Sequence, residues 1–418
     1  MRHFAHRNGE LHAEDVPLSR IADAVGTPVY VYSRATLTRH YRVFADAFAD
    51  VDSLVAFAVK ANSNLAVLKL LGDLGAGADV VSGGELARAL AAGIPGERIV
   101  FSGVGKTREE MRSALDAGIH MFNVESVEEL RVLSEVATSA GATANIAFRV
   151  NPDVAAGGHA KISTGKADNK FGIAWHTARD AYAEAARLPG IAVVGVDVHI
   201  GSQIADLAPY EAAIDRVAAL IGELRADGHT ITNFDLGGGL GIPYRSDGDA
   251  PPLPSAYAEM VRRKTAGLDV KLIFEPGRMI AGNAGVLLTR VVYAKDTPTK
   301  RFLVLDAAMN DLIRPALYDA FHEIEPVRDT DTRATYDVVG PVCESGDTFA
   351  KDREMGEAEA GELVVLHSAG AYGAVQASQY NTRPLVPEVM VDGDRFAVIR
   401  ERPALEDMLR LESVPDFL

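Results

Sequence analysis

Between residues 54 and 277, eight short β-branched segments alternate with helical stretches rich in Ala, Leu, Glu and Arg, and this alternation constrains the fold most strongly. The segments are LVAFAV, DVV, RIVF, IHMFNV, ANIAFRV, AVVGVDVHI, NFDLGG and VKLIFEPG. Near-continuous apolar strands separated by helices are typical of a parallel sheet covered by helices. Eight such units are the number that closes a TIM-type (β/α)8 barrel, which we expect over roughly residues 35–282.

The rhythm changes after Gly285, where short strands follow one another with turn signals and few helices. This pattern predicts a mostly β domain, either an antiparallel sandwich or a small barrel, made of residues 1–34 and 283–418. A chain of 418 residues is too long for one ordinary core, so two domains are expected. The strand segments are GVLLTRVVYA, RFLVLD, TYDVVGPV, GELVVLH, PEVMVDGD and RFAVIR.

Composition excludes several classes of protein. The net charge of -16 is spread along the chain, which argues against a nucleic-acid surface. The single cysteine, Cys343, cannot form an intrachain disulfide, as expected for a reducing cytosol. The N-terminus lacks an apolar core of signal-peptide length, and later apolar stretches are too short to span a bilayer. We therefore expect a cytoplasmic protein with no membrane partner.

A long loop, residues 151–172, interrupts the predicted barrel after its fifth strand. Loops of this length inside compact domains are usually functional or mobile. The sequence thus predicts a lid at this place.

Polar residues directly after apolar strands are functional candidates, because the C-terminal strand ends form the active face of a TIM-type barrel. Six units place polar or glycine residues at this rim. They are Lys60, Asp79, Arg149, His199, Gly237–Gly239 and Glu275–Arg278.

Lys60 follows a largely apolar strand in AFAVKAN. Burial at the barrel mouth disfavours the ammonium form, lowers the pKa, and leaves a neutral amine that condenses with an aldehyde. The alternative is a surface lysine whose stem covers the rim while its amine stays in water. The residue alone does not decide between them.

Two glycine-rich motifs can be compared as phosphate-binding sites, and only the first remains a candidate. GGGLG, residues 237–241, offers backbone amides after a strand, although glycines at this place are often only a turn. It is not a dinucleotide fingerprint, because Ile242 occupies the last glycine position. GVGKT, residues 103–107, resembles a P-loop but has Val100 in place of the first glycine, so we reject a nucleotide site there.

HIGSQ and EPGR follow the sixth and eighth strands. His199 suits stacking on a flat ring and Ser202 suits a phosphate oxygen, although a rim histidine with structural partners is the alternative. Glu275 facing a pyridine nitrogen would keep that nitrogen protonated. A structural ion pair between Glu275 and Arg278 is the other explanation for EPGR.

The β domain adds candidates in three motifs. Arg314 and Tyr318 stand in NDLIRPALYD, Cys343 and Glu344 in GPVCESGD, and Tyr372 in GAYG. A free cysteine is usually a small buried hydrophobe, but the polar neighbours of Cys343 favour an active-site loop.

Taken in order, these motifs resemble the fold-type III pyridoxal-phosphate decarboxylases, and within them the diaminopimelate decarboxylases, from about residue 27 to 412. VKAN is similar to the Schiff-base motif, which makes Lys60 the cofactor lysine. His199 would stack on the pyridine ring and Glu275 would meet its nitrogen. The resemblance implies no metal, and it implies a pyridoxal 5'-phosphate site made by Lys60, Asp79, Arg149, His199, Ser202, Gly238, Gly239, Glu275, Gly277, Arg278 and Tyr372.

The substrate end of the resemblance favours a diamino dicarboxylic acid. Its arginines suit a distal carboxylate, which guanidinium binds in two-pronged fashion, and ornithine-type enzymes have no such carboxylate to bind. The implied reaction converts meso-2,6-diaminopimelate to L-lysine and carbon dioxide, with Cys343 as proton donor. In the family Cys343 and Glu344 come from the partner subunit, which implies a homodimer with shared sites. The implied substrate residues are Arg278, Arg314, Tyr318, Glu344 and Tyr372.

Three other functions share this scaffold. A decarboxylase of ornithine, lysine, arginine or carboxynorspermidine has the same cofactor motifs and differs at the substrate end. A non-catalytic regulator would have no need of Lys60, Cys343 and the glycine run. An amino-acid racemase needs a second catalytic tyrosine in a different context, which is not evident here.

Overall fold

The computed structural model of the chain describes residues 2–154, 170–245 and 250–418. The chain divides into two compact units. The barrel unit comprises Thr38–Pro243 and Asp249–Ile280, and the β unit comprises Met1–Leu37, Tyr244–Gly248 and Ala281–Leu418.

Eight parallel strands close the barrel unit, in the order in which they follow along the chain. The ring is completed where β13 pairs with β5 and where β8 pairs with β9. A two-residue strand, β10 (Ile173–Ala174), adds to β9. The predicted (β/α)8 barrel is therefore confirmed. Its strands are β5 (Ser53–Ala58), β6 (Gly77–Val80), β7 (Ile99–Phe101), β8 (Met121–Val124), β9 (Ala144–Asn151), β11 (Ile191–Asp197), β12 (Asn233–Asp235) and β13 (Lys271–Phe274).

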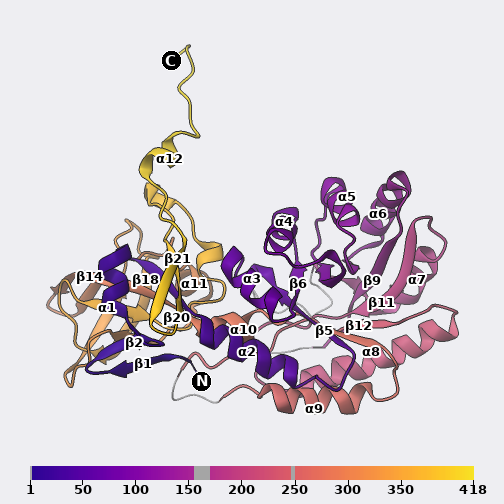
Figure 1. Cartoon of the computed structure of the whole chain (residues 1–418), viewed down its shortest axis with the longest axis horizontal. Helices are drawn as coiled ribbons and strands as arrows, with labels where there is room; N and C mark the ends of the chain where they lie inside the picture. The colour runs from indigo at the N-terminus through magenta and orange to yellow at the C-terminus, as the bar shows by residue number, and fades with distance from the viewer. Residues whose placement is uncertain (1, 155–169, 246–249) are drawn as a thin grey trace. The chain divides into compact units, whose positions relative to one another are not determined.

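Helices lie outside these strands (Figure 1). Their ends follow from local chemistry: Thr107 and Glu110 form a reciprocal capping box at the start of one helix, and Gly141 ends the next in the left-handed conformation. Within the described ranges, no helix is long and apolar enough to cross a membrane. The helices are α2 (Arg34–Asp46), α3 (Leu65–Asp73), α4 (Gly83–Ala91), α5 (Arg108–Asp116), α6 (Val127–Ala140), α7 (Ala178–Ala185), α8 (Ala208–Ala226), α9 (Pro254–Thr265) and α10 (Arg278–Ala281).

The barrel interior is a filled core. Side chains from five strands contact one another there, and helices cover the outer face, so most strand residues are buried on both faces. This double burial explains why the strands read as near-continuous apolar segments. The interior cluster is Leu54, Ala56, Val100, Met121, Ala147 and Ile273.

The β unit contains a nine-stranded sheet and a small sheet of β1, β2 and β3. The predicted mostly β domain is confirmed, but its pairing is mixed, because β15 runs parallel to β17 and β20 runs parallel to β4. The described strands are β1 (Phe4–Arg7), β2 (Glu10–Ala13), β3 (Val16–Pro17), β4 (Val29–Ser33), β14 (Gly285–Asp296), β15 (Arg301–Leu305), β16 (Ile324–Pro326), β17 (Arg333–Val339), β18 (Thr348–Gly356), β19 (Leu363–Leu366), β20 (Glu388–Asp392) and β21 (Arg395–Arg400). Its helices are α1 (Leu18–Val25), α11 (Arg314–Tyr318) and α12 (Leu405–Leu409).

Strand β4 joins the two ends of the chain within this unit. It pairs antiparallel with β14 and parallel with β20. Val29 and Val31 of β4 lie in one buried cluster with Val286 and Leu288 of β14 and with Val389 of β20. The N-terminal segment is therefore a central part of the β unit.

Candidate active site

Lys60 stands in a single 3-10 turn, Val59–Ala61, directly after β5. Its Nζ donates to Oδ2 of Asp79 at 2.6 Å, and its side chain is 35% exposed while that of Asp79 is fully buried. The sequence argument considered burial of the amine alone. The structure adds a carboxylate as the partner of the amine, and it places Asp79 inside β6, which begins at Gly77 and so earlier than the DVV segment. The amine thus points to a buried carboxylate, while part of the lysine side chain is exposed.

His199 follows β11 and is held by the glycine run. Its Nδ1 accepts a hydrogen bond from the backbone N–H of Gly238 at 3.1 Å, so Nδ1 carries a lone pair. Burial, and then the charge of Arg149, lower the pKa of His199 well below its ordinary value. The imidazole is therefore neutral, as suits a ring that stacks on another flat ring.

The glycine run is shaped by close backbone approach. A Cβ on Gly237 would lie 2.7 Å from Nδ1 of His199, and one on Gly239 would lie 2.5 Å from the carbonyl oxygen of Gly201. The amides of Gly237 and Gly238 donate to Asp235 and His199. Of these three amides, that of Gly239 has no hydrogen-bond acceptor among the described residues, so it is the best placed of the three for a phosphate.

Glu275 directly follows β13 and is 5% exposed. Its Oε1 accepts from Oγ of Ser102 at 3.1 Å and from Nδ2 of Asn123 at 3.3 Å. Arg278 instead donates to Oγ of Ser202 at 3.0 Å. These different partners argue against the structural ion pair as the explanation of EPGR. Within that turn, a Cβ on Gly277 would lie 2.8 Å from the Cβ of Ala61, which brings the EPGR turn against the segment that carries the lysine.

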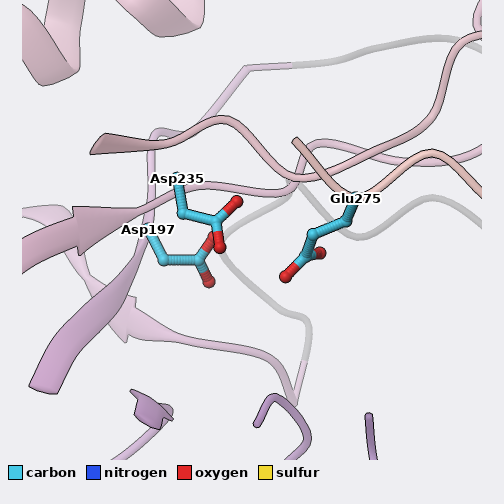
Figure 2. A group of neighbouring side chains, drawn as sticks. All are labelled: Asp197, Asp235 and Glu275. Carbon is cyan, nitrogen blue, oxygen red and sulfur yellow. The ribbon is translucent and has the colours of Figure 1, made fainter. Parts of the chain in front are cut away.

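Three buried carboxyl groups meet beside Glu275. Figure 2 shows Asp197 and Asp235 side by side with Glu275 facing them, and oxygens of the three lie within 4.8 Å of one another. Burial, and then the charge of Asp197, raise the pKa of Asp235 to about 8. Burial raises the pKa of Asp197 and Glu275 well above their ordinary values, helped by their acidic neighbours. The shared burial and mutual repulsion therefore favour the protonated forms of these carboxyl groups over three negative charges.

Arg149 of β9 is fixed from two sides. Its Nη1 donates to Oε1 of Glu125 at 3.2 Å, and its Nη2 donates to the carbonyl oxygen of His199 at 3.5 Å. The guanidinium carbon lies 4.8 Å from the ring centroid of Phe171. Arg149 thus links β9 by a hydrogen bond to the rim segment that carries His199.

In the β unit, Arg314 and Tyr318 stand at the two ends of α11. Arg314 is 7% exposed, and Oη of Tyr318 accepts from Nε2 of Gln376 at 3.5 Å. Tyr372 has φ +57°, a left-handed conformation that is strained for a bulky residue and is enriched at functional loops.

Cys343 is exposed, which rules out the buried-hydrophobe alternative. Its neighbour Glu344 accepts from Oη of Tyr380 at 3.0 Å. Asp347 anchors the same loop, since it accepts from the backbone N–H of Met309 and of Val342 at 2.7 Å each. The loop therefore presents a thiol and a carboxylate from a fixed backbone.

Sequence reasoning missed several polar groups of the site: Ser102, Asn123, Glu125, Asp197 and Asp235. Ser102 and Glu125 directly follow β7 and β8, and Asp197 and Asp235 end β11 and β12, whereas Asn123 is the penultimate residue of β8. The strand-end criterion that identified Lys60 and His199 would have found them had it been applied to every unit.

Two motifs of the barrel unit remain. Lys106 of GVGKT is buried, and its Nζ donates to Oε1 of Glu129 and to the carbonyl oxygens of Gly103 and Asn123. These contacts give this lysine a structural role within the barrel unit. The predicted lid at 151–172 lies largely outside the described residues, so it stays a prediction.

The family follows from comparison with known proteins. The model of the pyridoxal-dependent decarboxylase, pyridoxal binding domain, matches residues 34–282. A diaminopimelate decarboxylase from Zymomonas mobilis is 54% identical over 99% of this chain and 99% of its own. The chain belongs to the diaminopimelate decarboxylase family.

Solved structures of diaminopimelate decarboxylases support the same family assignment. The enzyme from Helicobacter pylori, complexed with L-lysine, has 42% identity and a TM-score of 0.91, covering 94% of this chain and 98% of its own. That from M. jannaschii, in co-complex with L-lysine, has 37% identity and a TM-score of 0.95, covering 99% and 98%. The predicted family is confirmed.

The residues of the barrel unit fit pyridoxal phosphate. An amine and a neutral imidazole stand at the same rim as a glycine run in which added side chains would clash. Oδ1 of Asp79 and Oδ1 of Asp197 are buried without a hydrogen-bond partner among the described residues. Buried polar atoms of this kind are expected where a polar ligand completes the network.

Proposed function

We propose that this chain decarboxylates meso-2,6-diaminopimelate and releases L-lysine and carbon dioxide, with pyridoxal phosphate linked to Lys60. The observation that carries the proposal is the amine of Lys60, held by Asp79 at the rim that also bears His199 and Glu275. Family membership supports the substrate, because relatives of more than 50% identity are named for it.

When bound, pyridoxal phosphate supplies an electron sink for the electron pair left by departing carbon dioxide. The protein's own groups prepare the site. Asp79 holds the Lys60 amine in place, and neutral His199 offers a flat face without a competing charge. Ser102 and Asn123 fix one oxygen of Glu275, which orients the other toward the site where we place the ring nitrogen.

The substrate end is part of the proposal. Arg278, Arg314 and Tyr318 bind the distal carboxylate and amine, since guanidinium favours a planar carboxylate. Cys343 returns a proton to the α-carbon and acts, with Glu344, from a partner subunit. The exposed thiol and the polar loop that carries it support this role. The proposal includes a cytoplasmic homodimer.

The rival functions have less support. Ornithine-type decarboxylases need no guanidinium for a distal carboxylate, whereas Arg314 is nearly buried and held by neighbouring polar groups. A regulator without catalysis leaves the pairing of Lys60 with Asp79 unexplained.

A substrate panel tests the proposal. Purified protein loaded with pyridoxal phosphate is offered meso-diaminopimelate, lysine and ornithine, and release of carbon dioxide is measured. We expect rapid release from diaminopimelate alone. Equal or faster release from lysine or ornithine would refute the substrate assignment, and no release from any of the three would refute the enzyme.

Mixed subunits test the shared site. Lys60→Ala and Cys343→Ala each inactivate a homodimer, but one intact site forms in a mixed dimer when the two residues come from different chains. We expect activity to return when the two inactive variants are unfolded and refolded together. If the mixture stays inactive while each variant remains dimeric, Cys343 does not act across subunits.

A further inference from the structure

The guanidinium of Arg314 is held by two side chains of the same unit. Its Nη2 donates to Oη of Tyr244 at 3.2 Å, and its Nε donates to Nε2 of His322 at 3.4 Å. The guanidinium carbon also lies 5.5 Å from the ring centroid of Tyr244, whose ring meets that of His322 edge to face. Two donors and the plane of the guanidinium are thereby fixed.

The hydrogen bond from Arg314 to His322 requires one tautomer of the neutral histidine. Its Nδ1 lies 2.8 Å from the carbonyl oxygen of His367, and a carbonyl only accepts, so Nδ1 carries the proton. The Nε–H of Arg314 only donates, so Nε2 of His322 carries the lone pair. Protonation of Nε2 would set two hydrogens and two positive charges against each other. His322 is therefore neutral, with its tautomer set by both neighbours.

The scaffold around His322 is rigid. His322 is fully buried, and its carbonyl oxygen accepts from Nη1 of Arg353 at 2.8 Å. The backbone N–H of His367 donates to the carbonyl oxygen of Glu323, where β16 and β19 pair antiparallel. The carbonyl that sets the tautomer thus belongs to the residue directly after β19, and a backbone hydrogen bond next to the β16–β19 pairing holds that residue.

We propose that His322 and Tyr244 are positioning residues that set the plane of Arg314 and thereby select substrates that keep a carboxylate at the end distal to the reacting carbon. The inference rests on the proposed function, in which Arg314 binds that carboxylate. Pairing between guanidinium and carboxylate is planar and two-pronged, so the plane of the arginine determines where the carboxylate sits. A tilted guanidinium would still be positive but would lose this match.

Two matched variants isolate the contact. In His322→Asn the amide nitrogen still reaches the carbonyl of His367, but the acceptor that Nε2 of His322 gives to Nε of Arg314 is removed. In His322→Gln the amide oxygen can stand in for Nε2 and accept from Arg314. For His322→Asn we expect KM for meso-diaminopimelate to rise about tenfold, the usual size of a lost hydrogen bond to a charged group, with kcat within about twofold. His322→Gln should recover most of that loss.

A pair of ligands separates positioning from general damage. L-Lysine keeps the distal carboxylate, whereas 1,5-diaminopentane has the same chain and amines without it. Inhibition constants for both are measured with wild type, His322→Asn, and Tyr244→Phe, which keeps the ring but removes the hydroxyl acceptor. We expect both variants to weaken L-lysine by about tenfold and to leave the diamine unchanged. Equal weakening of both ligands, or no change for either, would overturn the inference.

Failure of the inference differs from failure of the function. If wild-type protein releases no carbon dioxide from meso-diaminopimelate, the proposed function falls and the inference falls with it. If wild type is active and Arg314→Ala leaves KM unchanged, the function stands but there is nothing to position, so the inference is refuted. Should His322→Asn not fold, Tyr244→Phe decides by the same ligand comparison.

Discussion

The Nζ of Lys60 lies 2.6 Å from Oδ2 of Asp79, a carboxylate that is fully buried in β6, one residue before the strand ends. The pair joins the first two β/α units and holds a reactive amine at the rim of the barrel. A buried carboxylate without its cation is costly, so the pair stabilises the rim as well as orienting the amine. These two roles can be separated experimentally.

Substitution of Lys60 separates chemistry from stability. Lys60→Arg keeps a cation near Asp79 but cannot form the covalent link to the cofactor, whereas Lys60→Ala also leaves the carboxylate unpaired. We expect both variants to lose turnover and the visible absorbance of bound cofactor. Only Lys60→Ala should lower the unfolding free energy. Breaking a fully buried pair costs about 3–5 kcal/mol, and we expect a smaller loss here because the lysine side chain is 35% exposed. Near wild-type activity in either variant would contradict the assignment.

Gly239→Ala tests the glycine run. The added Cβ would lie 2.5 Å from the carbonyl oxygen of Gly201 and 2.8 Å from Oη of Tyr210, at a φ of +106°. We expect a loss of about 1–3 kcal/mol in unfolding free energy, measured by denaturant titration, together with weaker cofactor binding. Gly105→Ala is the control, since nothing lies within 4 Å of its added Cβ. Similar stability of the two variants would show that the close approach is not needed.

Glu275→Gln tests the acid proposed to face the ring nitrogen. Glutamine keeps an acceptor for Ser102 and Asn123 but has no carboxyl group that can share a proton with the ring nitrogen. We expect kcat to fall about 100-fold or more, with cofactor still bound. Asp235→Asn is the control, because a pKa of about 8 leaves Asp235 protonated near pH 7, where asparagine resembles it. Equal kcat in Glu275→Gln and wild type would remove the ring-nitrogen role.

The raised pKa of the Glu85 carboxyl should make the stability of the protein depend on pH near neutrality. Burial raises its pKa from 4.5 to about 7, so the folded chain holds this proton when the unfolded chain has released it. Its contribution to stability is fully present below about pH 4.5 and is lost as pH rises through about 7, by at most about 1.4 kcal/mol per pH unit. Glu85→Gln keeps the acceptor for the backbone N–H of Val81. We expect this variant to lose less stability than wild type between pH 5 and pH 8.

Glu110→Gln is the control with the opposite sign. Hydrogen bonds from the backbone of Gly83 and Thr107 lower the pKa of Glu110, so its contribution is present above the unfolded pKa and is lost in acid. This variant should differ from wild type in its acid limb and follow wild type between pH 5 and pH 8. Parallel curves for Glu85→Gln and wild type over that range would show that Glu85 does not hold its proton.

The barrel was predictable because period and burial agree in it. Parallel strands buried on both faces give unbroken apolar segments, and each is punctuated by a polar residue at one rim, such as Lys60 or His199. Strand β18 was missed because TFAKDREMG is rich in charge. It lies at one end of its sheet, where charged side chains protect an exposed edge.

Contacts between distant segments were not predictable. Arg314 was identified from its motif, but its neighbours Tyr244 and His322 come from segments that no local pattern links to it. In the same way, the strand-end criterion finds Asp197 and Asp235 singly, whereas the raised pKa of Asp235 depends on both being buried together. Such properties follow from the closed barrel and the β ladder, which bring together residues that the chain separates.

The position of β4 between β14 and β20 has a consequence for synthesis on the ribosome. This strand leaves the exit tunnel before the barrel does, its antiparallel neighbour follows only after the whole barrel, and its parallel neighbour comes about 100 residues later still. Domains tend to fold as they emerge, so the barrel has time to form while β4 waits with both edges bare. Chains released early, before Glu388, would keep one bare edge there, open to pairing with other nascent chains.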